Sequence, residues 1–314
     1  MSALPPRLAA AIEELVARAG GPVEAEVERL SAAYRGEGRS RAARTPAQVA
    51  AYLAYRAPAT FAAAAAVFRQ VAMQRPGWRP RTLLDAGAGP GVAAGAAVEA
   101  WPSLEAVTLV EAEPEMIAAG RELVPAGEWI RGDVRDARGS ADLVLASYVL
   151  GELDDAAGAA LRLWEQSTDT VAFVEPGTPA GYRRILAARA AVIAAGGYTV
   201  APCPHDLPCP LPADDWCHFA VRLPRSKLHR RAKGAELGYE DEKFSYAVLS
   251  REPVPKAPAR IIRQPQVRSG HVNLVTSERD GAVHERTVSR RQGGLYKDAK
   301  GAAWGDAFSA DERT

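Results

Sequence analysis

One aspartate and three glycines have the types and the spacing to hold a small ligand. Asp85 follows an apolar run that begins at Thr82. Three glycines come after it at alternate positions: Gly87, Gly89 and Gly91. Glycine lets the backbone turn sharply and approach a ligand, and the alanine-rich stretch that follows is typical of a helix whose first N–H groups would face that ligand. The sequence therefore predicts a strand, a tight glycine turn and a helix around a binding site.

The glycine spacing narrows the choice of ligand. The third glycine comes one place earlier than in the G-x-G-x-x-G turn that binds dinucleotides, and the Gly-Lys-Ser/Thr of a phosphate-binding P-loop is absent from the sequence. The stretch resembles motif I of class I S-adenosylmethionine (SAM) methyltransferases, D-x-G-x-G-x-G. A carboxylate before the glycines suits SAM, because SAM carries an ammonium and a sulfonium charge.

Polar residues also stand where the next predicted strands end. Val107–Glu111 is predicted to be a strand that ends in an acid about 20 residues after the glycines, where a carboxylate binds ribose hydroxyls in NAD sites as well. Residues 129–133 are predicted as a third strand ending in Asp133, which in this superfamily lies by the adenine edge. Residues 142–147 and 171–175 are predicted as the fourth and fifth strands. We predict that seven residues bind the cofactor: Asp85, Gly87, Gly89, Gly91, Glu111, Asp133 and Ser147.

The elements that must position these residues alternate along the chain. Strand-like runs alternate with helical stretches between residues 81 and 200, which predicts a parallel sheet covered by helices. The region before it is predicted to be helical, because apolar residues from Leu8 to Val16 recur on one helical face. Thr45-Pro46-Ala47-Gln48 is a helix-start signal, and Pro58 is predicted to interrupt the helix that it opens.

All three cysteines of the chain lie within 15 residues, in a proline-rich stretch after the predicted strands. They are Cys203, Cys209 and Cys217. A disulfide is not expected in a cytosolic protein, so a metal or a cluster is favoured over a disulfide. The C-x₅-C-x₇-C spacing lacks the C-x₂-C pairs of a zinc ribbon, whereas irregularly spaced thiolates suit an iron–sulfur cluster. Buried structural cysteines are the alternative. Pro202–Cys203 looks like the Pro-Cys of cytosine-5 RNA methyltransferases, but it comes after the fifth strand rather than the fourth.

The charge of the chain is unevenly distributed. Residues 221–300 hold 18 Lys/Arg and 9 Asp/Glu, although the whole chain has a formal net charge of only +1. A basic C-terminal third favours an anionic partner, RNA first of all, and a solvated basic surface is the alternative. The sequence has no apolar run of about 18 residues and no basic-then-apolar N-terminal signal, so we expect a cytoplasmic protein without a membrane span.

The chain resembles, over nearly its whole length, the methyltransferase-like proteins of the mitochondrial small ribosomal subunit (Rsm type) and their bacterial relatives. Besides the glycine motif, the resemblance rests on these stretches: Ala50–Thr60, Ser147–Leu153, Pro202–His205, Trp216–Phe219, Ser226–Arg230, Glu240–Tyr246 and Trp304–Asp306. It implies a SAM-type core, association with small-subunit ribosomal RNA during assembly or translation, and a four-cysteine [4Fe–4S] site.

The resemblance matches only three of the four cluster ligands, which are Cys203, Cys209 and Cys217. The fourth should lie in the stretch after His271, yet His271–Glu278 contains no cysteine. His271, Glu278 or an exogenous ligand could complete the cluster, or the cluster is lost in this chain.

The sequence identifies no catalytic residue. Tyr148 and Glu152 lie near where a substrate would sit, but the Asn/Asp-Pro-Pro-Tyr of many amine methyltransferases is missing after the fourth strand. We predict a class I SAM-dependent methyltransferase, a monomer, that acts on or with small-subunit ribosomal RNA. The alternatives are a non-catalytic assembly factor that binds SAM and a cluster, and a small-molecule methyltransferase without an RNA role.

The predicted fold class is α/β, with a Rossmann-like SAM methyltransferase sheet, an N-terminal helical region and a small C-terminal β-rich unit. We expect residues 1–80 to form the helical region and residues 81–200 the SAM-binding core. Residues 201–256 hold the cysteine-rich loop and the end of the core. Residues 257–314 form the basic β-rich unit, which we expect to be barrel-like.

Overall fold

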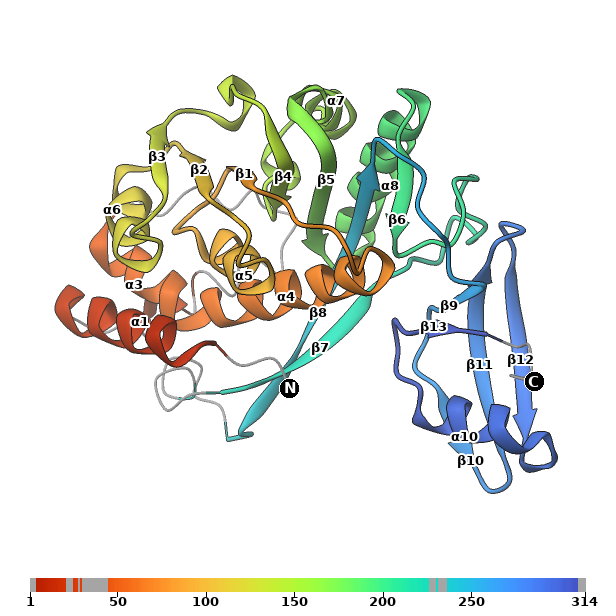
Figure 1. Ribbon diagram of the computed structural model, residues 1–314. Coiled ribbons are helices and arrows are strands. Elements are labelled where there is room, and N and C mark those ends of the chain that lie inside the picture. The colour runs from red at the N-terminus through yellow and green to blue at the C-terminus, as the bar shows by residue number, and fades with distance from the viewer. Residues whose placement is uncertain are drawn as a thin grey trace.

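A mixed β-sheet forms the centre of the larger part of the molecule (Figure 1). The computed structural model describes residues 4–20, 25–27, 29, 45–225, 230 and 236–309. In these residues the strand order is β3-β2-β1-β4-β5-β8-β6, and β7 pairs with β8. The strands are β1 (Thr82–Ala86), β2 (Ala106–Glu111), β3 (Glu128–Arg131), β4 (Ala141–Ser147), β5 (Ser167–Pro176), β6 (Tyr198–Ala201), β7 (Phe219–Pro224) and β8 (Tyr239–Ser250).

The sheet is parallel from β3 to β5 and changes direction at β8. Each of β2, β1, β4 and β5 runs parallel to the strand before it in this order, whereas β8 is antiparallel to β5, β6 and β7. The parallel sheet predicted for residues 81–200 is therefore confirmed, because β1 to β6 all run in the same direction. β8 comes from outside that range, enters as the antiparallel neighbour of β7 and needs no helical crossover. Six parallel strands with one antiparallel strand, β8, inserted before the last form the predicted class I SAM methyltransferase fold.

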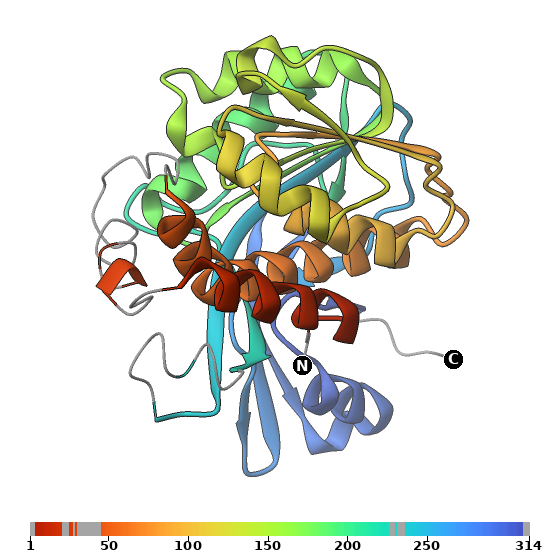
Figure 2. The ribbon, with the colours of Figure 1, turned by 90° about the vertical axis from the view of Figure 1, so that its left-hand side faces the viewer.

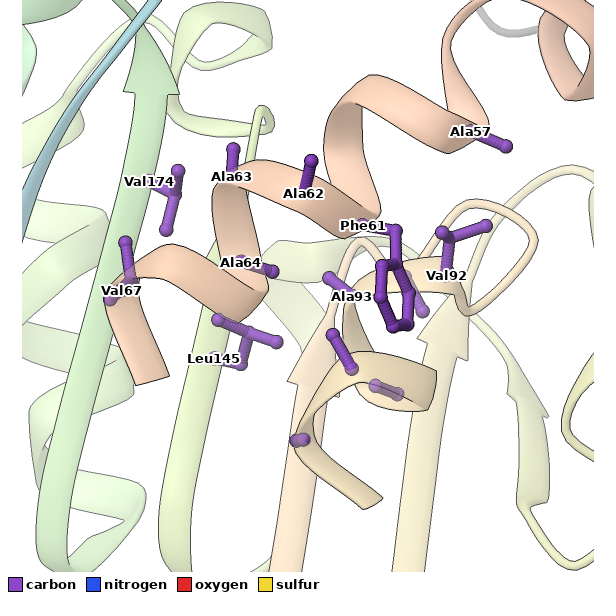
Figure 3. Close-up of a cluster of buried hydrophobic side chains, with 14 of the residues drawn as sticks. Ala57, Phe61, Ala62, Ala63, Ala64, Val67, Val92, Ala93, Leu145 and Val174 are labelled. Carbon is purple, nitrogen blue, oxygen red and sulfur yellow. The ribbon is translucent and has the colours of Figure 1, made fainter. Parts of the chain in front are cut away.

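Helices cover both faces of this sheet, because successive strand residues point to opposite sides. Leu143 and Leu145 belong to the same buried cluster as α4 (Ala57–Gln74) and α5 (Val92–Ala100), whereas Val144 faces the cluster of α7 (Ala156–Gln166) and α8 (Pro179–Ala194). Figure 3 shows alanines of α4 lying over β4 and β5, so that small side chains bring this helix close to the sheet. Figure 2 shows the helices before β1, coloured red to orange, on one side of the sheet.

The helices before the sheet agree with their sequence signals. In α1 (Pro6–Ala19) the buried residues include Leu8, Ile12 and Val16, and α3 (Pro46–Tyr55) begins after Thr45, whose side chain accepts a hydrogen bond from the Gln48 N–H. α3 ends just before Pro58, where α4 begins, and α6 (Pro114–Leu123) follows β2. No helix in the described residues is long and apolar enough to cross a membrane. The Ser226–Arg230 stretch lies, apart from residue 230, outside the described residues.

A second, antiparallel sheet follows β8 and lies beside the larger one (Figure 1). Its order is β10-β11-β9-β13, with β12 also paired to β11. The elements are β9 (Ala259–Ile261), β10 (Gln266–Arg268), β11 (His271–Glu278), β12 (Val283–Ser289), α10 (Gly293–Gly301) and β13 (Ala307–Phe308). The predicted β-rich unit is confirmed. The predicted barrel is not found, because no strand pair in residues 236–309 closes the sheet.

Trp129 of β3 packs against two glycines that leave room for its ring. A Cβ atom added to Gly120 of α6 would lie 2.1 Å from the Trp129 ring, and one added to Gly91 would lie 3.1 Å from it. Gly95 of α5 is a contrasting helical glycine, since the nearest atom to its added Cβ is 3.9 Å away. Only the first two glycines are therefore required by packing against the tryptophan.

We predict opposite effects of alanine at the two helical glycines. Gly120→Ala should lower the free energy of unfolding by about 1–3 kcal/mol, because the new methyl group overlaps the Trp129 ring. Gly95→Ala should leave it unchanged or raise it by up to about 1 kcal/mol, because alanine favours the helix. Urea denaturation followed by circular dichroism measures both values. Equal stabilities for the two variants would contradict the packing argument.

Candidate functional site

A cavity of about 410 Å³ opens at the carboxyl ends of β1, β2 and β4. β1 lies between β2 and β4, and ligands in open α/β sheets bind where the connections diverge in this way. Six of the seven residues predicted to bind a cofactor line the cavity: Asp85, Gly87, Gly89, Glu111, Asp133 and Ser147. The fold thus brings together residues from β1, β2, β4 and the segment after β3, which are far apart in the sequence.

The glycine turn has the backbone conformation that only glycine adopts easily. The φ angles of Gly87, Gly89 and Gly91 are +77°, +55° and +75°. A Cβ atom on Gly87 would also lie 2.5 Å from the Val149 side chain. Gly91 differs from the prediction, because it does not line the cavity; it precedes α5 and faces Leu109 and the Trp129 ring. Gly91 therefore contributes to the shape of the turn without lining the cavity.

Glu111 ties the second strand to the glycine turn. One carboxylate oxygen accepts a hydrogen bond from the Gly89 N–H at 2.7 Å, and the other accepts from the Ala112 and Glu113 N–H groups at 2.9 Å. Burial raises the pKa of this carboxyl, and these backbone donors oppose the shift. The side chain is held at the rim of the cavity, where a ligand hydroxyl could reach the same oxygens.

Asp133 is positioned by a short helical turn rather than by a strand. β3 ends at Arg131, so the prediction that the strand continues to Asp133 is wrong; Asp133 instead caps the 3₁₀ turn η1 (Val134–Asp136). Its carboxylate accepts from the Arg135 N–H at 2.8 Å and from the Arg135 guanidinium at 2.7 Å. The guanidinium holds the pKa of Asp133 below its usual value. This aspartate is therefore ionised where it lines the cavity.

The end of β4 presents an unsatisfied hydroxyl and a strained tyrosine. Ser147 Oγ is buried and has no hydrogen-bond partner in the described residues. Tyr148 has a φ of +59°, and it is the one non-glycine residue in the described part of the chain with a positive φ. Such strained conformations gather at functional sites. Both residues line the cavity, so a donor or acceptor on a ligand could satisfy Ser147 there.

Tyr148 is held by two residues that are distant in sequence. Its hydroxyl donates to Glu242 at 3.0 Å, and Arg56 donates to both oxygens of Glu242 at 2.8 and 3.2 Å. The Arg56 guanidinium also lies 5.4 Å from the centre of the Tyr148 ring. Neither Arg56 nor Glu242 was predicted as a site residue. The available signal was that both lie in stretches carrying the family resemblance, Ala50–Thr60 and Glu240–Tyr246.

Several carboxyl groups near the cavity titrate close to neutral pH. Burial raises the pKa of Asp85, Glu152 and Glu175 to about 7 in each case. Neighbouring acids, Glu111 among them, raise the pKa of Glu152 further, whereas Arg184 opposes the shift at Glu175 from 3.4 Å away. These carboxyl groups have few positively charged neighbours, so their environment favours a cationic ligand.

The three cysteines line a second, smaller cavity of about 40 Å³ between the two sheets. Cys209 Sγ lies 2.9 Å from the Tyr182 hydroxyl, and burial raises the pKa of Cys203 and Cys217. In the described residues, no three His, Cys, Asp or Glu side chains are close enough to hold a single metal ion. Thiolates are the ligands of iron–sulfur clusters, so the chemistry of this donor set suits three of the four ligands of such a cluster.

The two fourth-ligand candidates named from the sequence, His271 and Glu278, do not line this cavity. Glu278 is bound by Arg286, whose guanidinium donates to its two oxygens at 2.6 and 2.7 Å. His271 lies at the opposite end of β11. The expectation that either residue completes a cluster is therefore not supported by its position.

Two mitochondrial proteins are similar to this chain. Human "Ribosome assembly protein METTL17, mitochondrial" is 28% identical over 283 residues, which cover 81% of this chain and 61% of that protein. "Rsm22-cox11 tandem protein 2, mitochondrial" of Schizosaccharomyces pombe is 25% identical over 356 residues, covering 89% of this chain and 45% of that protein. The chain thus spans less than two thirds of either relative. The names of these relatives do not support the expected cytoplasmic location.

A solved structure and a family model are also similar to this chain. The crystal structure of magnesium protoporphyrin IX methyltransferase (ChlM) from Synechocystis PCC 6803 with bound SAH is 10% identical, with a TM-score of 0.42 over 62% of this chain and 84% of that chain. The model of the family described as "Mitochondrial small ribosomal subunit Rsm22" matches residues 46–309. Because that match includes most of the chain, the chain belongs to the Rsm22 family.

Proposed function

We propose that this protein binds SAM in the cavity beside the glycine turn and acts on or with small-subunit ribosomal RNA during ribosome assembly. The observation that carries the first part is the turn itself, where Gly87 and Gly89 have positive φ angles and the Gly89 N–H is bound to Glu111. The cavity volume of about 410 Å³ is in the range of small-molecule sites. In this proposal Glu111 accepts from the ribose hydroxyls and Asp133 lies by the adenine edge.

The charge of the cavity supports SAM over a neutral or anionic ligand. Asp85, Glu111 and Glu152 line the cavity together with Asp133, Asp154 and Asp155, and the cations that line it are Arg135 and Arg162. Bound SAM would supply an electrophilic methyl group on a positively charged sulfur. A positive charge beside these carboxyl groups favours their ionised forms and is in turn stabilised by them.

The second sheet supports an RNA partner. β10 and β11 pair so that Arg268 faces His271, which faces Ser289, and the Arg290 N–H donates to the Gly270 carbonyl at 2.8 Å. The exposed side chains of Arg268, Arg290 and Arg291 therefore gather at one end of this sheet. Clustered arginines on one surface attract phosphate groups. The names of the relatives, which describe ribosome assembly and a small ribosomal subunit, agree with this partner.

Methyl transfer is the finer part of the proposal. Transfer requires mainly that the acceptor be aligned with the methyl group, and in this proposal Tyr148 and Glu152, which line the cavity, lie beside the acceptor. The Tyr148 hydroxyl is engaged by Glu242, so this residue is suited to orient a substrate through its ring rather than to remove a proton. A protein that binds SAM without transferring its methyl group would use the same residues.

The proposed function is tested with SAM carrying a labelled methyl group and small-subunit particles from cells that lack this protein. We expect the protein to sediment with the particles and the label to appear in the ribosomal RNA. Sedimentation without label would support the assembly role and remove methyl transfer. A protein that binds SAM but does not sediment with the particles at any salt concentration would overturn the ribosomal role and favour a small-molecule methyltransferase.

Substitution at the end of β2 tests the SAM site. Glu111→Ala should weaken SAM binding about 10- to 100-fold, because a charged hydrogen bond contributes about 1.5–3 kcal/mol. Glu105→Ala is the matched control. Glu105 is exposed, directly precedes β2 at the end opposite Glu111, and pairs with Arg81. Isothermal titration calorimetry measures both affinities. Wild-type SAM affinity in the Glu111 variant would exclude the proposed role of this carboxylate.

The buried Asp85 carboxyl predicts a pH dependence of stability. Its pKa of about 7 in the folded protein is above the unfolded value, so between about pH 4 and 7 the folded state keeps a proton that the unfolded state has lost. Its stabilising contribution is therefore greatest below that window and falls as pH rises through it. Relative to Asp85→Asn, the wild type should lose up to about 1.4 kcal/mol per pH unit.

Urea denaturation of both proteins without ligand at several values from pH 4 to 8 measures this difference. Buried histidines such as His205, whose pKa is lowered, change stability in the opposite direction, but they are common to both proteins and cancel. Asp241→Asn is the control. Arg222 lowers the pKa of this exposed carboxyl, so its contribution to stability changes at a more acidic pH than that of Asp85. Parallel pH profiles for wild type and Asp85→Asn would disprove the prediction.

A further inference from the structure

Ser277 is the residue of β11 that faces the cysteine cavity. It lines the cavity together with Cys203, Cys209 and Cys217, and its hydroxyl lies 3.3 Å from His205 Nε2. Ser277 is buried and comes from the second sheet, whereas the cysteines come from the segment between β6 and β7. The three thiols and the Ser277 hydroxyl therefore line one cavity, and Ser277 comes from the stretch in which the family resemblance places the fourth ligand.

Strand geometry explains why Ser277 and not its neighbours occupies this position. Successive residues of a strand point to opposite faces, so Glu278 lies on the other face of β11, where Arg286 binds it. His271 is six residues away along the same strand, a distance of about 20 Å. Ser277 is paired with Arg260 of β9, which keeps it in register with the cavity.

Two buried arginines beside the cavity indicate an anionic occupant. Arg189 and Arg260 line it, with exposed fractions of 4% and 1%, and neither forms a salt bridge with a described residue. Arg189 donates to the carbonyls of His205 and Leu207, and Arg260 donates to the carbonyls of Pro202 and Gly305. A buried cation is costly without a nearby negative charge, and thiolates around iron and sulfide would supply it.

We propose that Ser277 is the fourth ligand of a [4Fe–4S] cluster held by Cys203, Cys209 and Cys217. Assembly from two ferrous ions, two ferric ions and four sulfide ions forms three iron–thiolate bonds and one iron–oxygen bond without electron transfer, and each of the four side chains releases one proton to the solvent. Ligand exchange of this kind requires no change in the oxidation state of the protein. The proposal is independent of SAM binding.

The test is anaerobic reconstitution of the 314-residue chain with equal amounts of ferrous and ferric iron and with sulfide. Wild type should bind about four iron and four sulfide per chain and show the visible absorbance of an iron–sulfur cluster. After mild oxidation with ferricyanide, which accepts one electron, Ser277→Ala should have lost about one iron as Fe²⁺ and give the paramagnetic signal of an oxidised three-iron cluster. Ser277→Cys should restore the four-iron content and make the cluster more resistant to loss of iron, which shows that the alanine result does not reflect misfolding.

Ser245→Ala is the matched serine control. Ser245 lines the same cavity, but its hydroxyl donates to the Cys217 carbonyl at 2.8 Å, so this variant should keep the wild-type iron content. His271→Ala and Glu278→Ala should also keep it. A four-iron cluster in Ser277→Ala that matches the wild type, loss of iron in the His271 or Glu278 variant alone, or a wild-type protein that binds no iron and sulfide would each overturn the assignment.

Discussion

The backbone pairing of β8 is the interaction on which both cavities depend. This strand is hydrogen-bonded to β5 over residues 244–250, to β7 over residues 239–244 and to β6 at its end. Glu242 of β8 reaches Tyr148 and Arg56 beside the glycine turn, and Ser245 and Tyr246 line the cysteine cavity three and four positions later. A shift of β8 by one residue would turn every one of these side chains to the opposite face, so one register determines the geometry of both sites.

The sequence predicts the parallel half of this sheet well because its signals are local. β2 and β4 are apolar runs that end at a polar residue, and the glycines after Asp85 indicate the turn after β1 directly. The antiparallel insertion of β8 was not predicted, since the apolar residues of Lys243–Leu249 are compatible with either direction. The end of β3 was also misplaced, because Trp129 and Ile130 continue an extended pattern and only Asp133 capping η1 shows where the strand stops.

The candidate sites also depend on contacts between distant segments, which the sequence does not show. The glycine motif, the acids at the end of β2 and after β3, and Ser147 account for six residues of the larger cavity, but Arg56 and Glu242 are brought to Tyr148 from segments that no spacing rule connects. At the smaller cavity the sequence shows a missing cysteine, and only the facing of β11 shows that Ser277 stands there while Glu278 and His271 do not. The division of the chain into four regions stays a prediction.

Arg260 connects the second sheet to the core, which limits how far the two parts can evolve separately. Its side chain leaves β9, bonds to Gln70 of α4 and to the Pro202 carbonyl, and is almost completely buried. A unit attached in this way cannot be exchanged between proteins as an interchangeable module, because a recipient would lack the helix and the loop that receive the arginine. The β-rich unit and the methyltransferase-like core are therefore expected to be inherited together, and a core that lost the unit would have to fill the vacated cavity with larger side chains.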